Sequence, residues 1–227
     1  IFGSSGGGKS VFGQNFLLQE YESGALIRVI DEGQSYKKLC KTLGGSFIEF
    51  TDSSEVCLNP FSLVQNINDD LDQLARVVKQ MASPTTPLDD FCMSKIKQAI
   101  KSVYSVSGTK TTINDIADFL NVQEEEEIRR LGSQLFEYTL DGSYGKYFNG
   151  ENNLNLDAQM VVLELEGLKS TPDLKTVVMM MVCTRIQADM YRNFNYSRKF
   201  VLFEEVTSYF ADPLVGDFIS DFYERVR

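Results

Sequence analysis

The chain has 227 residues, a formal net charge of −10 at pH 7 and a composition that is 43% hydrophobic. This length fits one large domain or two small ones, and the apolar content excludes a globally disordered chain. The sequence contains no histidine, which excludes catalytic triads with a histidine base, histidine-ligated zinc and haem on a proximal histidine. The pI near 4.6 disfavours broad nucleic-acid binding, because a polyanion would meet a mostly repulsive field.

The first sixty residues alternate between helical and strand patterns. A glycine-rich segment, residues 3–10, precedes an amphipathic helical pattern over residues 11–21. Residues 25–30 and 47–50 are short apolar runs with β-branched residues, and a short helix over residues 35–43 separates them. Strands that alternate with helices, the first opening into a glycine-rich loop, indicate a mainly parallel sheet covered on both faces.

The pattern becomes wholly helical between about residues 63 and 138, which we interpret as an all-α insertion. Thr112 with Asp115 three residues later is a helix-start signature. The acidic run 124–127 is expected to be a solvated first turn, favoured by the helix dipole, rather than a metal site. The segment predicts four helices: around residues 71–81, over residues 89–104, from Thr112 and from Glu124.

Strand patterns return at residues 159–165 and 199–203, on either side of a long buried helix over residues 173–191. The Met179–Met181 triplet in that helix is expected to fill the core. We therefore expect an α/β fold in three consecutive parts: residues 1–62 and 141–227 as the two parts of the core, and residues 63–140 as the insertion. Residues 1–2 have the pattern of the last residues of a strand, and the helix pattern over residues 218–223 runs toward Arg227 without a Gly or Pro stop, so we expect a segment of a longer protein.

The spacing of the cysteines indicates their redox state, and the length of the longest apolar run indicates whether it could span a membrane. Cys40, Cys57, Cys92 and Cys183 show neither a CxxC pair nor metal-ligand spacing. Without a signal peptide, reduced buried thiols are expected rather than disulfides. The run over residues 177–183 is far shorter than the roughly 20 residues that span a bilayer.

Residues 3–10 match the pattern G-x-x-x-x-G-K-[ST] at every fixed position. In such a loop the glycines let backbone N–H groups wrap a phosphate, the lysine neutralises the β/γ oxygens and the serine hydroxyl ligates Mg²⁺. The loop follows an apolar stub and opens a helix, which is the context that the motif requires. The predicted nucleotide-binding residues are Gly3, Ser4, Ser5, Gly6, Gly7, Gly8, Lys9, Ser10 and Val11, with Lys9 also acting in catalysis.

A P-loop needs a partner acid at the end of a neighbouring strand. Glu204 and Glu205 follow the apolar run 201–203, and we favour Glu204 with Ser10 at the metal and Glu205 as the catalytic acid. Mg²⁺ demands tight geometry, so the extra methylene of Glu204 relative to the usual Asp is a departure from the pattern. The alternative strand ends in Glu164 and Glu166, which otherwise face solvent or a neighbouring subunit.

Other candidate residues have two interpretations each. Asp31 and Glu32 end a third strand at the same edge, and either cap a turn or take a secondary part in the site. An aromatic group at residues 144–148 either packs a glycine-rich connection or forms a partner surface. Three arginines are candidate arginine fingers or ordinary surface charges: Arg185, Arg192 and Arg198.

The ordered set of motifs resembles the nucleotide-binding domain of TraC-type conjugative-transfer ATPases, the large ATPases of type IV secretion systems. The set comprises the P-loop, residues 30–36, 43–45 and 58–61, the 141–168 stretch, and Phe203-Glu204-Glu205. The likeness covers nearly the whole chain and implies a RecA-like P-loop NTPase with a helical insertion. It further implies ATP and Mg²⁺ as cofactors, hexamers, and other secretion components as partners at the cytoplasmic face of the bacterial inner membrane.

By this resemblance, Lys9 and Ser10 bind phosphate and Mg²⁺, Glu205 is the catalytic acid, and ATP hydrolysis powers pilus assembly and substrate transfer. Family members usually have Asp where this chain has Glu204, which puts the rate of hydrolysis in question. Two alternatives remain open. One is a DNA-translocating ATPase of the coupling-protein kind, which the acidic charge disfavours; the other is a nucleotide-gated assembly scaffold that hydrolyses little ATP.

Overall fold

A computed structural model of the chain describes residues 8–51, 53–193, 195–204, 216 and 219–220. The chain divides into two compact units. The sheet unit comprises residues 1–54, 155–170 and 183–227, and the helical unit comprises residues 55–154 and 171–182. The three-part division after residues 62 and 140 stays a prediction.

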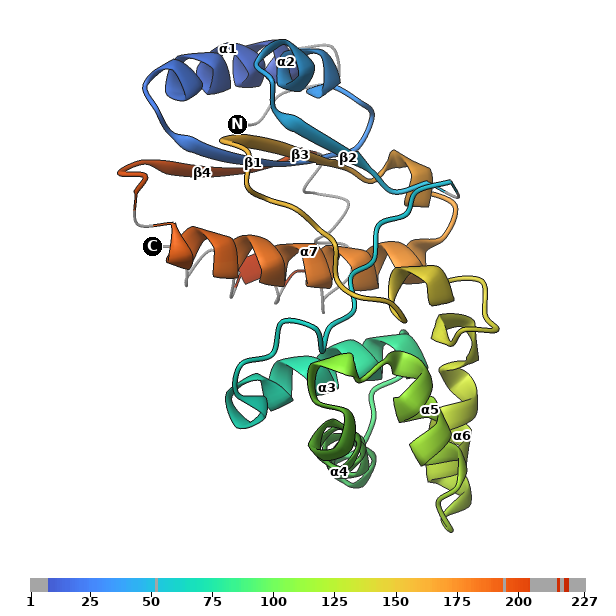
Figure 1. The fold of residues 1–227 in the computed structure, drawn as a ribbon. Coiled ribbons are helices and arrows are strands. Elements are labelled where there is room, and N and C mark those ends of the chain that lie inside the picture. Colours follow the sequence, from blue (N-terminus) through green and yellow to red (C-terminus); the bar gives the residue numbers. More distant parts are fainter. Residues whose placement is uncertain (1–7, 52, 194, 205–215, 217–218, 221–227) are drawn as a thin grey trace. The chain divides into compact units, whose positions relative to one another are not determined.

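The sheet unit contains four parallel strands in the order β2-β3-β1-β4 (Figure 1). The strands are β1 (Leu26–Asp31), β2 (Ser46–Glu49), β3 (Met160–Glu164) and β4 (Lys199–Phe203). Each lies within a residue or two of its predicted position, and the predicted parallel α/β sheet is confirmed. Because the registers pair Asp31 with Glu164 and Ile30 with Phe203, the carboxyl ends of neighbouring strands are level.

Helices α1 (Lys9–Glu22) and α2 (Lys37–Thr42) cover one face of this sheet (Figure 1). Alternate residues of a strand point to the same face, so Ile27 and Val29 of β1 and Met160 and Val162 of β3 form the apolar surface on which the helices pack. The same buried cluster contains Leu17, Tyr36 and Cys40. This packing fixes α1, and therefore the end of the P-loop, above the sheet.

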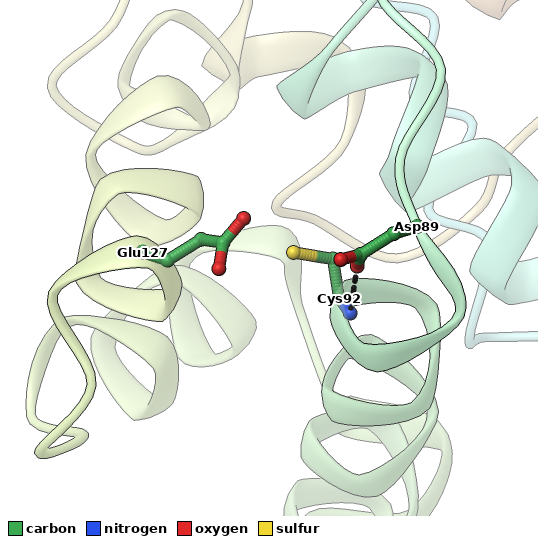
Figure 2. A group of neighbouring side chains, drawn as sticks. All are labelled: Asp89, Cys92 and Glu127. Carbon is green, nitrogen blue, oxygen red and sulfur yellow. Dashed lines mark hydrogen bonds between the residues drawn. The ribbon is translucent and has the colours of Figure 1, made fainter.

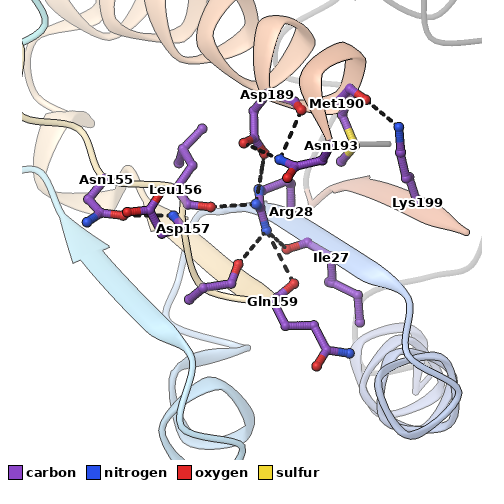
Figure 3. A network of polar contacts seen from close by, with 11 residues as sticks. Ile27, Arg28, Asn155, Leu156, Asp157, Gln159, Asp189, Met190, Asn193 and Lys199 are labelled. Atoms are coloured by element: carbon purple, nitrogen blue, oxygen red, sulfur yellow. Dashed lines mark hydrogen bonds and ion pairs between the residues drawn. The ribbon is translucent and has the colours of Figure 1, made fainter. Parts of the chain in front are cut away.

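Arg28 points to the opposite face and is fully buried there (Figure 3). Its Nε and Nη2 lie 2.9 and 2.8 Å from Asp189 Oδ2, in the half of α7 (Pro172–Arg192) that belongs to the sheet unit. The remaining N–H groups donate to the backbone carbonyls of Ile27, Leu156, Ala158 and Gln159. A buried guanidinium needs such complete pairing, so this network joins β1, the chain before β3 and α7.

Every regular element of residues 55–154 is helical, as the predicted insertion requires. The α-helices are α3 (Ile67–Ala82), α4 (Asp90–Ser107), α5 (Ile113–Asn121) and α6 (Glu126–Gln134). Short 3-10 turns are η1 (Gly108–Lys110), η2 (Phe136–Tyr138) and η3 (Gly145–Tyr147), and η4 (Glu166–Leu168) follows β3 in the sheet unit. The predicted capping box of Thr112 with Asp115 is confirmed at the start of α5.

The aromatic residues near the end of the helical unit pack inward. Tyr147 and Phe148 are buried, and the Phe148 ring centroid lies 5.6 Å from that of Tyr138. Gly145 is required here, since a Cβ on it would lie 2.0 Å from the Thr139 carbonyl oxygen. Of the two interpretations, packing of the glycine-rich connection therefore accounts for these residues.

The cysteines and the methionine triplet of α7 lie in the interior. All four cysteines are buried free thiols, as predicted, and Met179, Met180 and Met181 are buried in α7. Across the described ranges, none of the helices combines the length and the apolar character that crossing a membrane would need.

Candidate functional site

The site begins at the amino end of α1. Gly8 precedes the helix with φ 77°, a left-handed conformation that favours glycine at this point of the motif. Gly8 has no side chain with which to cap this end, and the first turn contains no acidic residue. The backbone N–H groups and the positive end of the helix dipole at such a helix start favour an anion. The predicted residues Gly3–Gly7 lie outside the described residues, whereas Gly8, Lys9, Ser10 and Val11 open the helix.

Ser10 and Glu204 meet although 194 positions separate them in sequence. The Ser10 Oγ donates a hydrogen bond to Glu204 Oε1 at 2.7 Å. Glu204 directly follows β4, and its backbone N–H donates to the Ile30 carbonyl at 2.9 Å, which continues the sheet pairing to this residue. The two residues predicted to hold the metal are thus side by side, with their oxygens available at one place.

The second oxygen of the Glu204 carboxylate contacts a residue to which the sequence assigned no role. Tyr36, at the start of α2, donates its hydroxyl to Glu204 Oε2 at 3.3 Å. The hydroxyl also lies against the backbone of α1, where a Cβ on Gly13 would be only 2.4 Å from it. Burial, and then the charge of Glu204, raise the pKa of the Tyr36 phenol, so the group keeps its proton and acts as a donor.

Asp31 brings a second acidic group to this edge, from the central strand β1. Its side chain is fully buried, Oδ2 accepts from the Tyr36 backbone N–H at 2.9 Å, and Oδ1 has no hydrogen-bond partner among the described residues. Burial, together with the charges of Glu164 and Glu204, raises the pKa of Asp31 to about 6. Asp31 therefore caps this turn through Oδ2, and its secondary part in the site stays a prediction.

Glu164, on the strand that was the alternative source of the catalytic acid, accepts hydrogen bonds from the backbone instead. Its carboxylate accepts hydrogen bonds from the backbone N–H groups of Gly33 (3.2 Å), Gln34 (2.7 Å) and Glu166 (2.8 Å). Gly33 and Gln34 both have positive φ, 115° and 58°, so this carboxylate stabilises an uncommon turn between β1 and α2. With its oxygens occupied in this way, Glu164 is suited to positioning the loop that carries Tyr36.

The remaining predicted residues are placed as follows. Glu205, the predicted catalytic acid, lies outside the described residues, as does the side chain of Arg192. Arg198 precedes β4, at the amino end of the strand, and pairs with Glu20 at 2.9 Å. Arg185 lies in α7, and its buried Nε has no hydrogen-bond partner within the part of the chain that the structure describes.

One member of the acidic run approaches other ligand types within the helical unit. Glu127 of α6 faces Asp89 and Cys92 at the start of α4, and one ligand atom of each lies within 4.8 Å of the others (Figure 2). Asp89 caps α4 by accepting from the Cys92 backbone N–H at 2.8 Å. Burial and both carboxylates raise the pKa of the Cys92 thiol to about 12, so the thiol stays protonated between two acceptors, which explains this grouping without a metal.

The chemistry of the edge follows from this geometry. The Ser10 hydroxyl and the carboxylates of Glu204 and Asp31 are hard oxygen ligands at this edge, and the amino end of α1 beside them offers backbone N–H donors to an anion. This combination suits a phosphate chain with a divalent cation such as Mg²⁺. The pairing of Ser10 with Glu204 was predictable from the motif, whereas Tyr36 was not, because its contact depends on how α2 packs.

The chain is similar to known proteins in both sequence and structure. A family model described as "TraG P-loop domain" matches residues 1–227. Protein TraC of Escherichia coli (strain K12) is 32% identical over the whole chain, which spans 27% of TraC. The structure of VirB4 of Thermoanaerobacter pseudethanolicus superposes with a TM-score of 0.82 at 20% identity, over 96% of this chain and 89% of that one.

Proposed function

Because the chain belongs to the TraG P-loop domain family, we propose that its sheet unit binds ATP with Mg²⁺ and hydrolyses it to ADP and phosphate. The observation that supports this most directly is the 2.7 Å contact between Ser10 Oγ and Glu204 Oε1. A P-loop hydroxyl and a strand-end acid are the two groups that hold Mg²⁺ in enzymes of this kind. The likeness to TraC over the full length of the chain supports the same assignment.

Each residue of the proposed site has a separate role in binding or hydrolysis. Lys9 and the backbone N–H groups at the start of α1 bind and orient the phosphates, while Ser10 and Glu204 would hold Mg²⁺. The buried Oδ1 of Asp31, which has no partner within the described ranges, fits a cation at this edge, since oxygen ligands are what Mg²⁺ prefers. When bound, Mg²⁺ neutralises charge that develops on the phosphate oxygens. Glu205 orients and deprotonates the attacking water.

In the whole protein this activity would drive a type IV secretion or conjugation machine. The chain spans about a quarter, 27%, of TraC, so the remainder of such a protein would supply its other contacts. We propose assembly into rings, of six subunits by the resemblance, at the cytoplasmic face of the inner membrane, where hydrolysis powers pilus assembly and substrate transfer. Turnover per subunit should then rise with protein concentration, and full activity of a strict monomer would contradict the ring.

A nucleotide-gated scaffold is the second candidate, and Glu204 is the residue that favours it. A longer acid at the metal would permit ATP binding while slowing hydrolysis, since Mg²⁺ demands near-ideal geometry. The acidic net charge of −10 weighs against the DNA-translocating alternative, which salt-dependent DNA binding by the intact protein would reveal.

The experiment is ATP binding and steady-state hydrolysis by the intact protein and its Lys9→Ala variant. Lys9 would contact phosphate in the ground state, so its removal should weaken binding and abolish turnover together. Wild-type protein that binds ATP without measurable turnover would favour the scaffold. Wild-type protein that binds no nucleotide would refute both.

A further inference from the structure

Glu204 is held by hydrogen bonds at both of its carboxylate oxygens. Ser10 Oγ donates to Oε1 at 2.7 Å, and the Tyr36 hydroxyl donates to Oε2 at 3.3 Å. The first contact belongs to the P-loop motif. The second comes from the start of α2, which neither the motif nor the family comparison assigns to the site.

Tyr36 is anchored firmly enough to hold another residue in place. Its side chain is 1% exposed and belongs to the apolar cluster between the sheet and α1. Its backbone N–H donates to Asp31 Oδ2 at 2.9 Å. The hydroxyl lies against the α1 backbone at Gly13, the only residue type that leaves room for it there, since a Cβ would be 2.4 Å away.

The longer side chain of Glu204 needs a contact that holds its carboxylate in place. Relative to Asp, the side chain has one more methylene, about 1.5 Å of reach, and one more rotatable bond to immobilise. A carboxylate on the longer arm can reach the Tyr36 hydroxyl while it keeps its contact with Ser10. From the same backbone position, the shorter side chain of Asp would end about 1.5 Å closer to the backbone, so we expect it to lose at least one of the two contacts.

We propose that Tyr36 is a positioning residue for Glu204, whose hydroxyl fixes the second carboxylate oxygen so that this longer acid can serve the Mg²⁺ site beside Ser10. The inference rests on the proposed function, because it assigns Glu204 to the metal. Tyr36 touches neither nucleotide nor metal in this assignment and acts through Glu204 alone. Gly13 contributes to this positioning, since the absence of a side chain lets the phenol approach α1.

The test is Tyr36→Phe in the intact protein, which removes only the hydroxyl. The readout is the Mg²⁺ concentration that gives half of the maximal gain in binding of a fluorescent ATP analogue, with turnover measured in parallel. We expect this concentration to rise about 3- to 10-fold, the range for an ordinary hydrogen bond and less than for most bonds to a charged group, because the bond is long. Binding of the analogue in EDTA should not change.

Tyr21→Phe is the matched control. The Tyr21 hydroxyl also comes from the layer of helices above the sheet, but it donates to the Leu43 carbonyl at 2.9 Å. Removing it should leave the Mg²⁺ requirement at the wild-type value. Circular dichroism should confirm that both variants remain folded.

A Glu204→Asp background makes the test specific. If the hydroxyl acts by holding the longer carboxylate, Tyr36→Phe should change the Mg²⁺ requirement less than 2-fold once the acid is Asp. An equal effect of Tyr36→Phe in both backgrounds would overturn the proposal, and so would an unchanged or lower Mg²⁺ requirement in the single variant. Failure of wild-type protein to bind the analogue would instead refute the proposed function.

Discussion

The close approach of Tyr36 to α1 predicts an unusual response to the substitution Gly13→Ala. Glycine inside a helix is less favourable than alanine by roughly 0.5–1 kcal/mol, so this change would ordinarily stabilise α1. Here the new Cβ would lie 2.4 Å from the Tyr36 hydroxyl oxygen, and the next nearest ring atom, Cζ, is 3.4 Å away. An ordinary contact requires about 1 Å more than the hydroxyl allows.

The expected magnitude follows from these two distances. Displacing the phenol in a packed core costs about 1–3 kcal/mol, so Gly13→Ala should be net destabilising in the wild-type background. In a Tyr36→Phe background the 2.4 Å contact is gone and the remaining 3.4 Å contact is ordinary. The same substitution should then be neutral, or stabilising by up to about 1 kcal/mol.

The assay is chemical denaturation of the four proteins in this cycle, with the free energy of unfolding as the readout. Gly132→Ala in α6 is the control, since its Cβ would meet Asn121 Oδ1 at 2.5 Å. The effect of this control should not depend on Tyr36. Equal effects of Gly13→Ala in the two backgrounds would refute the proposed contact between the phenol and α1.

Two further substitutions concern buried charges. Asp31→Asn should stabilise the metal-free protein on the order of 2–3 kcal/mol at pH 8, because burial raises the pKa of this acid to about 6 from 3.8 and favours the neutral form in the folded state. That gain should shrink as the pH falls through 6 toward 4 in denaturation measured with EDTA, and a pH-independent gain would contradict it. Asp189→Asn should cost about 2–4 kcal/mol by leaving the buried Arg28 uncompensated. Asp72→Asn, which breaks an exposed pair with Lys97, should cost little, and equal costs in denaturation would argue against the buried network.

Local patterns in the sequence predicted most of the fold. The four strands are short apolar runs bounded by polar turns, and their residues lie where the patterns put them. The start of α5 was predictable because the Thr112 capping box is a contact between residues three apart. The motif also predicted that Ser10 would lie beside an acid that follows a strand, since P-loop chemistry requires both groups at one edge.

The contacts that were not predictable join residues far apart in the chain. Arg28 interrupts an apolar strand, and only the position of Asp189 in α7 explains why a charge is tolerated there. Glu164 had the appearance of a catalytic acid, but its oxygens are taken by backbone N–H groups of a turn whose positive φ values a single sequence does not reveal. The role of Tyr36 likewise depends on a partner 168 positions away.

The most direct test of the proposed ATPase is the Glu205→Gln variant of the intact protein, assayed for ATP binding and for steady-state turnover. This substitution keeps the shape of the side chain and removes the base, so binding should persist while hydrolysis falls by about 10²- to 10⁴-fold, the usual contribution of a positioned base. Glu164→Gln, which weakens the hold of a carboxylate on backbone N–H groups of the loop before Tyr36, should lower turnover far less than Glu205→Gln. Wild-type turnover in Glu205→Gln with none in Glu164→Gln would contradict the assignment and move the catalytic acid to β3.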